Sequence, residues 1–300
     1  MTNKPTGVML MAYGGPDSLE DVEPYLLDVR GGRPTARELI AEVRHRYALI
    51  GGRSPLLELT LAQARALQGM LGAEYKVYVG MRHWHPYIKE ALAEVAEDGI
   101  ERLIALVMAP HYSRMSVGAY MQRLGEARTA LLPALQVTEI ASWKTHPLFL
   151  DALSEKSHAA LAKFESADVE IIFSAHSLPE RILAGGDPYP QELLDTVQAL
   201  VERLGPVRWQ FAYQSAGSTG EKWLGPEVGE VIAKLAAQGK RNILVQPVGF
   251  VCDHVEILHD IDIVYMQQAR ELGVHLVRAE SLNASPLLIA ALADLVRSAS

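Results

Sequence analysis

The sequence predicts an α/β protein made of two similar lobes, each a parallel sheet flanked by helices. Short apolar runs rich in Val, Ile and Tyr alternate with longer amphipathic stretches, which is typical of parallel sheets covered by helices. Two pairs of stretches also echo each other, 8–16 with 171–179 and 99–107 with 239–245. We therefore expect lobes at 1–148 and 149–300, with the last helix packing back on the first lobe.

Eight apolar runs are predicted as strands because each stands before a turn signal or a helical pattern. They are 8–13, 75–79, 103–109, 137–141, 169–174, 209–213, 243–248 and 275–277.

Helix ends are predicted from capping and breaking residues. Thr35 with Glu38 has the spacing of a capping box for a helix that runs to about Leu49. A helical stripe around residues 91–95 ends at Gly99, and Ser285 followed by proline opens the last helix.

Composition excludes several classes of protein. The 300 residues are 49% hydrophobic and 21% charged, which is ordinary for a globular chain and unlike a disordered one. The net charge of -8 and the lack of a basic block argue against a nucleic-acid partner. No signal peptide or membrane span is apparent, so we expect a cytoplasmic protein. Cys252 is the single cysteine, so we expect no disulfide and no iron–sulfur cluster.

Reactive side chains gather after the predicted strands, where open α/β sheets bind their ligands. His176 ends one strand, where an imidazole can act as a base or as a metal ligand. A second cluster of acids and imidazoles stands after the strand at 243–248: Asp253, His254, Glu256, His259, Asp260 and Asp262. Glu256 and Asp260 share a helix face at this spacing, although acids near a helix N-terminus also simply complement its dipole. Oxygen and imidazole ligands without thiolates suit a loosely held divalent transition ion such as ferrous iron.

A basic and aromatic group follows the first strand. It consists of Arg30, Arg33, Arg44, Arg46, Tyr47, Arg53 and Ser54. Arginines bind carboxylates through two parallel hydrogen bonds, so this group suits a small molecule with several carboxylates, and a solvated helix face is the alternative. The fingerprints of metalloproteases, hydrolases and nucleotide-binding proteins (HExxH, GxSxG, the P-loop and GxGxxG) are absent.

Taken together, the motifs resemble the ferrochelatase family, and most closely the coproporphyrin ferrochelatases of monoderm bacteria. The matching segments follow the family's order almost from end to end. They are MAYGGP (11–16), RGGR (30–33), RY (46–47), GGRSPL (51–56), APHYS (109–113), SAHSLPE (174–180), GDPYP (186–190), YQSAG (213–217), WLGP (223–226) and PVGFVCDHVE (247–256). The histidine loop combined with the Asp-His-x-Glu helix start is the specific pair.

The resemblance implies two Rossmann-like lobes with the porphyrin in a cleft between them, and insertion of Fe(II) without redox change. His176 and Glu256 would be the catalytic, metal-binding pair. Tyr13 would lie on the opposite face of the porphyrin as an axial ligand to the product iron. The other porphyrin-binding positions would be Arg30, Arg46, Tyr47, Ser54 and Tyr120. Fe(II) is then a substrate, and no further cofactor is expected.

The resemblance also defines departures and alternatives. Many relatives carry a third acid after Glu256 and Asp260, but this chain has Val264 at that position. The row of ligands for an outer divalent metal near Asp260 would therefore be shorter, or it would use His259 or Asp262. We expect a monomer that makes coproheme III in heme biosynthesis. The preference for coproporphyrin III rests on the YQSAG and WLGP segments. The alternatives are a protoporphyrin IX ferrochelatase, a chelatase for another metal and tetrapyrrole, and a tetrapyrrole carrier.

Overall fold

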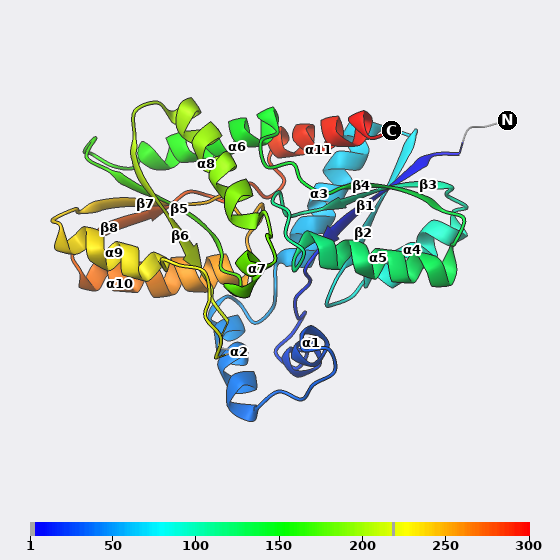
Figure 1. The fold of residues 1–300 in the computed structure, drawn as a ribbon, viewed down its shortest axis with the longest axis horizontal. Helices are drawn as coiled ribbons and strands as arrows, with labels where there is room; N and C mark the ends of the chain where they lie inside the picture. Colours follow the sequence, from blue (N-terminus) through cyan, green and yellow to red (C-terminus); the bar gives the residue numbers. More distant parts are fainter. Residues whose placement is uncertain (1–3, 218–219) are drawn as a thin grey trace. The chain divides into compact units, whose positions relative to one another are not determined.

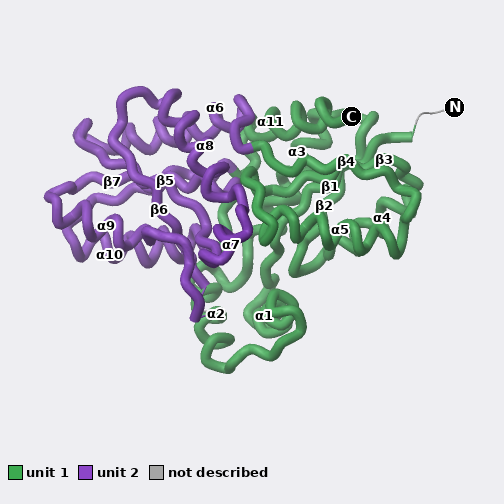
Figure 2. Tube along the Cα trace, viewed as in Figure 1, with its two compact units in different colours: residues 1–143, 252–255, 283–300 green, residues 144–251, 256–282 purple. Residues whose placement is uncertain are grey.

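The protein contains two four-stranded parallel sheets. The computed structural model describes residues 4–217 and 220–300, and all eight predicted strands are present (Figure 1). The chain divides into two compact units (Figure 2). Unit 1 comprises Met1–Trp143, Cys252–Val255 and Asn283–Ser300, and unit 2 comprises Lys144–Val251 and Glu256–Leu282. The boundary between the two units falls after Trp143, shortly before the helix that begins at Pro147, whereas the sequence predicts the boundary after residue 148.

The sheet of unit 1 has the strand order β2-β1-β3-β4. Its strands are β1 (Thr6–Ala12), β2 (Tyr75–Met81), β3 (Arg102–Val107) and β4 (Gln136–Ile140). Every residue of β1 is buried, because this inner strand is covered on both faces.

Helices cover both faces of this sheet (Figure 1). One face carries α4 (Ile88–Glu97) and α5 (Val117–Leu131), whose Leu92 and Leu124 pack with Met9 and Met11 of β1. The other face carries α3 (Leu56–Leu71), and the last helix, α11 (Pro286–Ser298), packs against α3 within unit 1. The stretch between β1 and α3 forms α1 (Val22–Val29) and α2 (Arg37–Leu49).

The sheet of unit 2 has the order β6-β5-β7-β8, which is the order of the first sheet repeated. Its strands are β5 (Glu170–His176), β6 (Arg208–Gln214), β7 (Asn242–Pro247) and β8 (His275–Arg278). The paired stretches of the sequence fall on equivalent strands, since 8–16 and 171–179 overlap β1 and β5, and 99–107 and 239–245 overlap β3 and β7. The echo in the sequence therefore corresponds to a repeated topology.

Helices also cover both faces of the second sheet (Figure 1). The helices α6 (Pro147–Leu161) and α8 (Tyr189–Leu204) pack together on one face. The other face carries α9 (Val228–Ala237), the π-helix η1 (Glu256–Tyr265) and α10 (Met266–Glu271), whose apolar residues join one core cluster. A short helix, α7 (Arg181–Ala184), follows β5.

The predicted helix ends agree with the structure at three of four places. The helix that follows Thr35 ends at Leu49, as expected. Gly99 follows α4 with φ +66°, and Ser285 is the N-cap of α11, as expected. The capping box at Thr35 is wrong, because α2 begins at Arg37 with Ala36 as its N-cap, and Thr35 Oγ1 is buried without a hydrogen-bond partner. In the described ranges, no helix combines the length and the apolar character that crossing a bilayer requires.

Candidate active site

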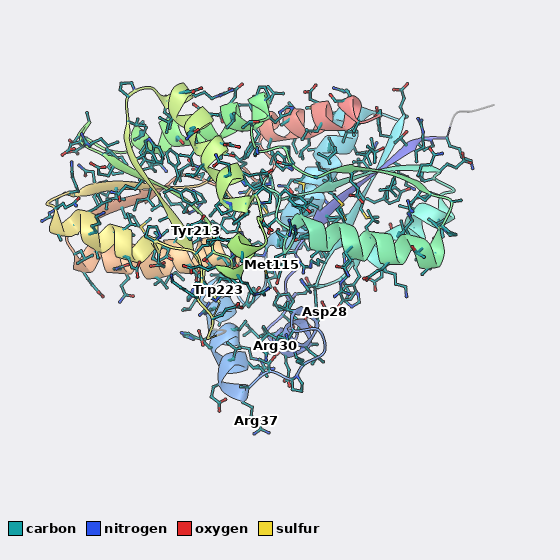
Figure 3. All side chains as sticks on the ribbon, in the orientation of Figure 1. Asp28, Arg30, Arg37, Met115, Tyr213 and Trp223 are labelled. Atoms are coloured by element: carbon teal, nitrogen blue, oxygen red, sulfur yellow. The ribbon has the colours of Figure 1, made fainter. Side chains whose placement is uncertain are left out.

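His176 is the last residue of β5, and the loop after the strand fixes its ring. Nδ1 hydrogen-bonds to the backbone carbonyl of Ser177, so Nδ1 carries a proton and Nε2 points the other way. The hydroxyl of Tyr189, on α8, donates to the backbone carbonyl of His176 at 3.0 Å. The rings of Trp223 and Phe250 flank the imidazole at centroid distances of 6.3 and 6.5 Å. Trp223 is labelled in Figure 3.

Glu256 is the first residue of η1, and its carboxylate faces the imidazole. Oε1 of Glu256 lies 3.3 Å from Nε2 of His176. The side chain of Glu256 is 32% exposed and that of His176 is 30% exposed, so a ligand can reach the pair. The sequence predicts an ordinary helix here, but η1 is a π-helix over ten residues. π-Helical segments are rare and are frequently found at functional sites.

The carboxylate controls the charge of the imidazole. Burial disfavours the imidazolium, but the nearby charge of Glu256 and its hydrogen bond outweigh burial, with smaller contributions from the Ser177 carbonyl and Asp260, and raise the pKa of His176 to about 9. At neutral pH the unliganded site is therefore an imidazolium–carboxylate pair. A cation that binds there displaces one proton from Nε2.

Asp260 lies one turn further along η1 and is already held by two neighbours. Ser215 Oγ donates to Oδ2 at 2.6 Å, and His259 Nδ1 lies 2.8 Å from Oδ1. Asp262 forms a two-pronged ion pair with Arg278 at 2.6 and 2.9 Å. Within 4–217 and 220–300, no three His, Cys, Asp or Glu side chains converge to hold a metal ion. An outer metal site at Asp260 stays a prediction.

Tyr13 follows β1 in unit 1, and it is 40% exposed. Its ring lies 4.7 Å from that of His83, and the guanidinium of Arg82 lies 5.9 Å from its centroid. Arg82 also lies 5.4 Å from the ring of Tyr120, on α5, and so joins two of the predicted porphyrin-binding residues. Sequence reasoning missed Arg82 and His83, although they directly follow β2 and the rule about strand ends would have found them.

His83 is buried and is paired with α1. Its Nδ1 lies 2.7 Å from Oδ2 of Asp28, which Figure 3 labels beside Arg30. Burial is the largest influence on the pKa of His83 and lowers it; Arg82 and Arg123 lower it further, against the opposing effect of Asp28. The ring is therefore neutral at neutral pH.

Tyr47 and Ser54 pack on the glycine turn after β1. A Cβ added at Gly15 would lie 2.5 Å from Ser54 Oγ and 3.4 Å from the Tyr47 hydroxyl oxygen, so only glycine permits this approach. Ser54 N donates to Pro16 O at 2.8 Å, which holds the start of α3 against the turn. The structure therefore brings Tyr47 and Ser54 together beside Gly15.

The two predicted carboxylate-binding arginines differ in their surroundings. Arg46 forms an ion pair with Glu42 one turn earlier on α2. Arg30, at the end of α1, has a buried Nε without a hydrogen-bond partner, and no carboxylate in the described part of the chain pairs with it. Arg30 therefore offers the more available cation. It belongs to unit 1 with Tyr13, Arg46, Tyr47, Ser54 and Tyr120, whereas His176, Glu256 and Asp260 belong to unit 2.

Known proteins match this chain over its whole length. The ferrochelatase family model matches residues 5–300. A ferrochelatase of Herpetosiphon aurantiacus is 44% identical over 291 residues, which is 95% of each chain. A coproporphyrin III ferrochelatase of Geobacillus is 39% identical over 305 residues, covering 99% of this chain and 98% of the relative.

Solved structures support the fold. The sirohydrochlorin chelatase SirB of Bacillus subtilis, with cobalt, has a TM-score of 0.62 at 9% identity and covers 98% of this chain and 95% of its own. CbiX, from siroheme biosynthesis in denitrifying bacteria, has a TM-score of 0.54 at 14% identity, with coverage of 98% and 99%. These likenesses confirm the chelatase-like α/β fold, and the sequence relatives confirm the resemblance, so the chain belongs to the ferrochelatase family, whose enzymes insert iron into porphyrin in heme biosynthesis.

Proposed function

We propose that this chain inserts Fe(II) into coproporphyrin III, with His176 and Glu256 as the catalytic pair. The porphyrin loses two pyrrole protons and gains one Fe(II), so the charge balances without any change of oxidation state. Both groups of the pair can accept a proton, and both can replace water in the shell of the incoming metal. The observation that carries the proposal is the distance of 3.3 Å between Nε2 and Oε1 at the end of β5.

The charge of the pair sets the order of events. Because the pKa of His176 is about 9, Nε2 holds a proton in the free protein at neutral pH. That proton leaves before or as Fe(II) arrives, after which Nε2 and the Glu256 carboxylate are both free to act as bases. On this scheme Glu256 plays two parts, since it holds the proton on His176 in the free protein and takes a pyrrole proton during the reaction.

The choice of coproporphyrin III rests on different observations. This substrate carries four carboxylates, against two in protoporphyrin IX, and the side chain of Arg30 offers a cation without an internal acid partner. The Geobacillus relative named for coproporphyrin III matches nearly the whole chain. Relatives named only as ferrochelatases match equally well, so the substrate needs a direct test.

The substrate test is anaerobic Fe(II) insertion followed by absorbance, with the two porphyrins run in parallel. We expect a higher kcat/KM with coproporphyrin III than with protoporphyrin IX. A preference for protoporphyrin IX would overturn the substrate assignment and leave the ferrochelatase activity in place. Parallel reactions with Co(II) and Ni(II) test the metal preference, and faster insertion of either would favour a chelatase for another metal.

The catalytic pair is tested with a double substitution, His176→Ala with Glu256→Ala. We expect porphyrin binding to persist and insertion to fall below detection, because no base remains beside the metal. The matched control removes the exposed imidazole–carboxylate pair of unit 1, His85 and Glu90, where Nδ1 lies 2.9 Å from Oε2. Insertion that survives loss of His176 and Glu256 would overturn the assignment.

A further inference from the structure

Gln214 is a buried residue whose backbone pairs with the strand of His176 and whose side chain contacts the backbone of Glu256. It is the last residue of β6 and stands opposite His176 in the register of β5 and β6. Its backbone carbonyl accepts a hydrogen bond from Ser177 N at 2.8 Å, immediately after His176. Its side chain has no exposed surface. The residue is therefore part of the wall behind the site and does not itself reach a substrate.

The side-chain amide of Gln214 bridges β5 and η1. Nε2 donates to the backbone carbonyl of Glu256 at 3.0 Å, and Oε1 accepts from Ser174 Oγ at 2.8 Å. The orientation of the amide is fixed, because a carbonyl only accepts and the NH2 group must face Glu256. Ser174 then satisfies the oxygen, so both ends of the buried amide are paired.

The next residue holds η1 at a second point. Ser215 Oγ donates to Asp260 Oδ2 at 2.6 Å. Ser215 adopts φ +59°, the left-handed region that costs a non-glycine residue about 1 kcal/mol or more. The neighbouring residues Gln214 and Ser215 therefore hold η1 at two points. Gln214 bonds the backbone of Glu256, and Ser215 bonds the side chain of Asp260 one turn later.

We infer that Gln214 is a positioning residue for metal insertion, which holds the backbone of Glu256 so that the carboxylate meets Nε2 of His176. The inference rests on the proposed roles of His176 and Glu256. Without the amide, the first residue of η1 loses a hydrogen bond to the β6 strand end, and the carboxylate is less firmly fixed against the imidazole. Loss of such supporting hydrogen bonds around a metal site costs about 10- to 100-fold in activity or metal affinity.

Unit 2 contains a matched control, Gln246 on β7. Its Oε1 accepts from Ser157 Oγ at 2.8 Å and its Nε2 donates to the backbone carbonyl of Pro247 at 3.1 Å. It is as buried as Gln214, at 1% exposure, and it is held by the same kinds of partner. It makes no hydrogen bond to His176 or Glu256. Removing either amide should cost similar stability, but only one should change the chemistry.

The experiment compares Gln214→Met with Gln246→Met, since methionine keeps the length of glutamine and removes both hydrogen bonds. For Gln214→Met we expect kcat to fall about 10- to 100-fold with the KM for porphyrin within about twofold. The pH midpoint of kcat should also move down, as the carboxylate leaves the imidazole. For Gln246→Met we expect kcat and its pH midpoint to match the wild type, with a comparable loss of thermal stability. Equal kinetics in the two variants would overturn the inference.

Two further variants keep the outcomes separate. If Gln214→Met fails to fold, Ser174→Ala tests the same link, because it removes the hydroxyl that satisfies the amide oxygen; a fall in kcat of about threefold or more supports the inference, and wild-type kcat overturns it. Glu256→Gln tests the proposed function alone. Wild-type insertion by Glu256→Gln would overturn the catalytic pair. If Glu256→Gln loses insertion but Gln214→Met and Gln246→Met have equal kinetics, only the role of Gln214 is overturned.

Discussion

Nε2 of His176 lies 3.3 Å from Oε1 of Glu256, and the two side chains come from the end of a strand and the start of a π-helix. The charge of each therefore depends on the other. Replacing the carboxylate changes the proton affinity of the imidazole as well as removing a proposed metal ligand, and this predicts a signature of the pair in the pH dependence of the reaction.

The rate of metal insertion should rise with pH toward about 9, because His176 must lose its Nε2 proton before it can accept another. In Glu256→Gln the two largest raising influences are gone while burial still lowers the pKa of His176, so the midpoint of the residual rate should fall well below 9. The measurement is single-turnover insertion across a pH series, with chemical shifts of the His176 ring as an independent titration. An unchanged midpoint in Glu256→Gln would contradict the coupling.

His83 should make the fold sensitive to acid. Its pKa is lowered in the folded protein, so the unfolded chain binds more protons as the pH drops below about 6.5. The stabilisation from the neutral, buried ring is complete above that pH and is lost as the pH falls toward the lowered pKa, with a slope of up to about 1.4 kcal/mol per pH unit. Chemical unfolding of His83→Gln from pH 7 to pH 4 should show a shallower decline than the wild type. Parallel declines would show that His83 does not contribute.

Tyr13→Phe should change the absorbance spectrum of the bound product more than it changes the rate of insertion. The hydroxyl of Tyr13 is the predicted axial ligand to the product iron, whereas the proposed bases are His176 and Glu256. We expect a changed absorbance spectrum of the bound iron porphyrin and a kcat within about threefold of the wild type, since an opposite-face ligand takes no pyrrole proton. Tyr75→Phe, which removes a hydroxyl bonded to Ser300, is the control and should leave the spectrum unchanged. An unaltered spectrum in Tyr13→Phe would argue against axial ligation.

Arg30→Ala should weaken porphyrin binding more than Arg46→Ala does. The cation of Arg30 has no internal acid partner, and a hydrogen bond to a charged group contributes about 1.5–3 kcal/mol, so the KM for porphyrin should rise about tenfold or more. Arg46 is half-exposed and already paired with Glu42. An exposed ion pair between Arg46 and a porphyrin carboxylate would contribute at most about 1 kcal/mol, which limits the rise in the KM for porphyrin to about fivefold. Equal effects of the two substitutions would show that the partner on α2 does not matter.

Gly15→Ala should destabilise unit 1 and disturb Ser54 and Tyr47. The added methyl group would meet both Ser54 Oγ and Ser54 Cβ, at 2.5 and 2.6 Å, so the backbone must shift at a cost of about 1–3 kcal/mol. Gly125→Ala on α5 is the control, because a methyl group there meets nothing within 4 Å and alanine favours the helix by about 1 kcal/mol. The melting temperature should therefore fall in Gly15→Ala and rise in Gly125→Ala. A Gly15→Ala protein as stable as the wild type would contradict this packing.

The sequence by itself determined the strands, the fold class and the family. Parallel strands buried on both faces, such as β1, are continuous apolar runs, and that signal is local. The chemistry at strand ends is also local, so His176 and Glu256 are candidates from their places in the chain, and the family resemblance predicts that they act as a pair.

Only the tertiary structure decided how these residues are paired and buried. The π-helix at Glu256 was not predicted, because its hydrogen-bond pattern depends on contacts with other elements, among them those of Gln214 with Glu256 and of Ser215 with Asp260. The same holds for Arg82 over Tyr13 and Tyr120, and for Arg30 without an acid where Arg46 has one. Pairing, burial and the resulting pKa values depend on distances between residues far apart in the chain, and the sequence contains those distances only through the folded protein.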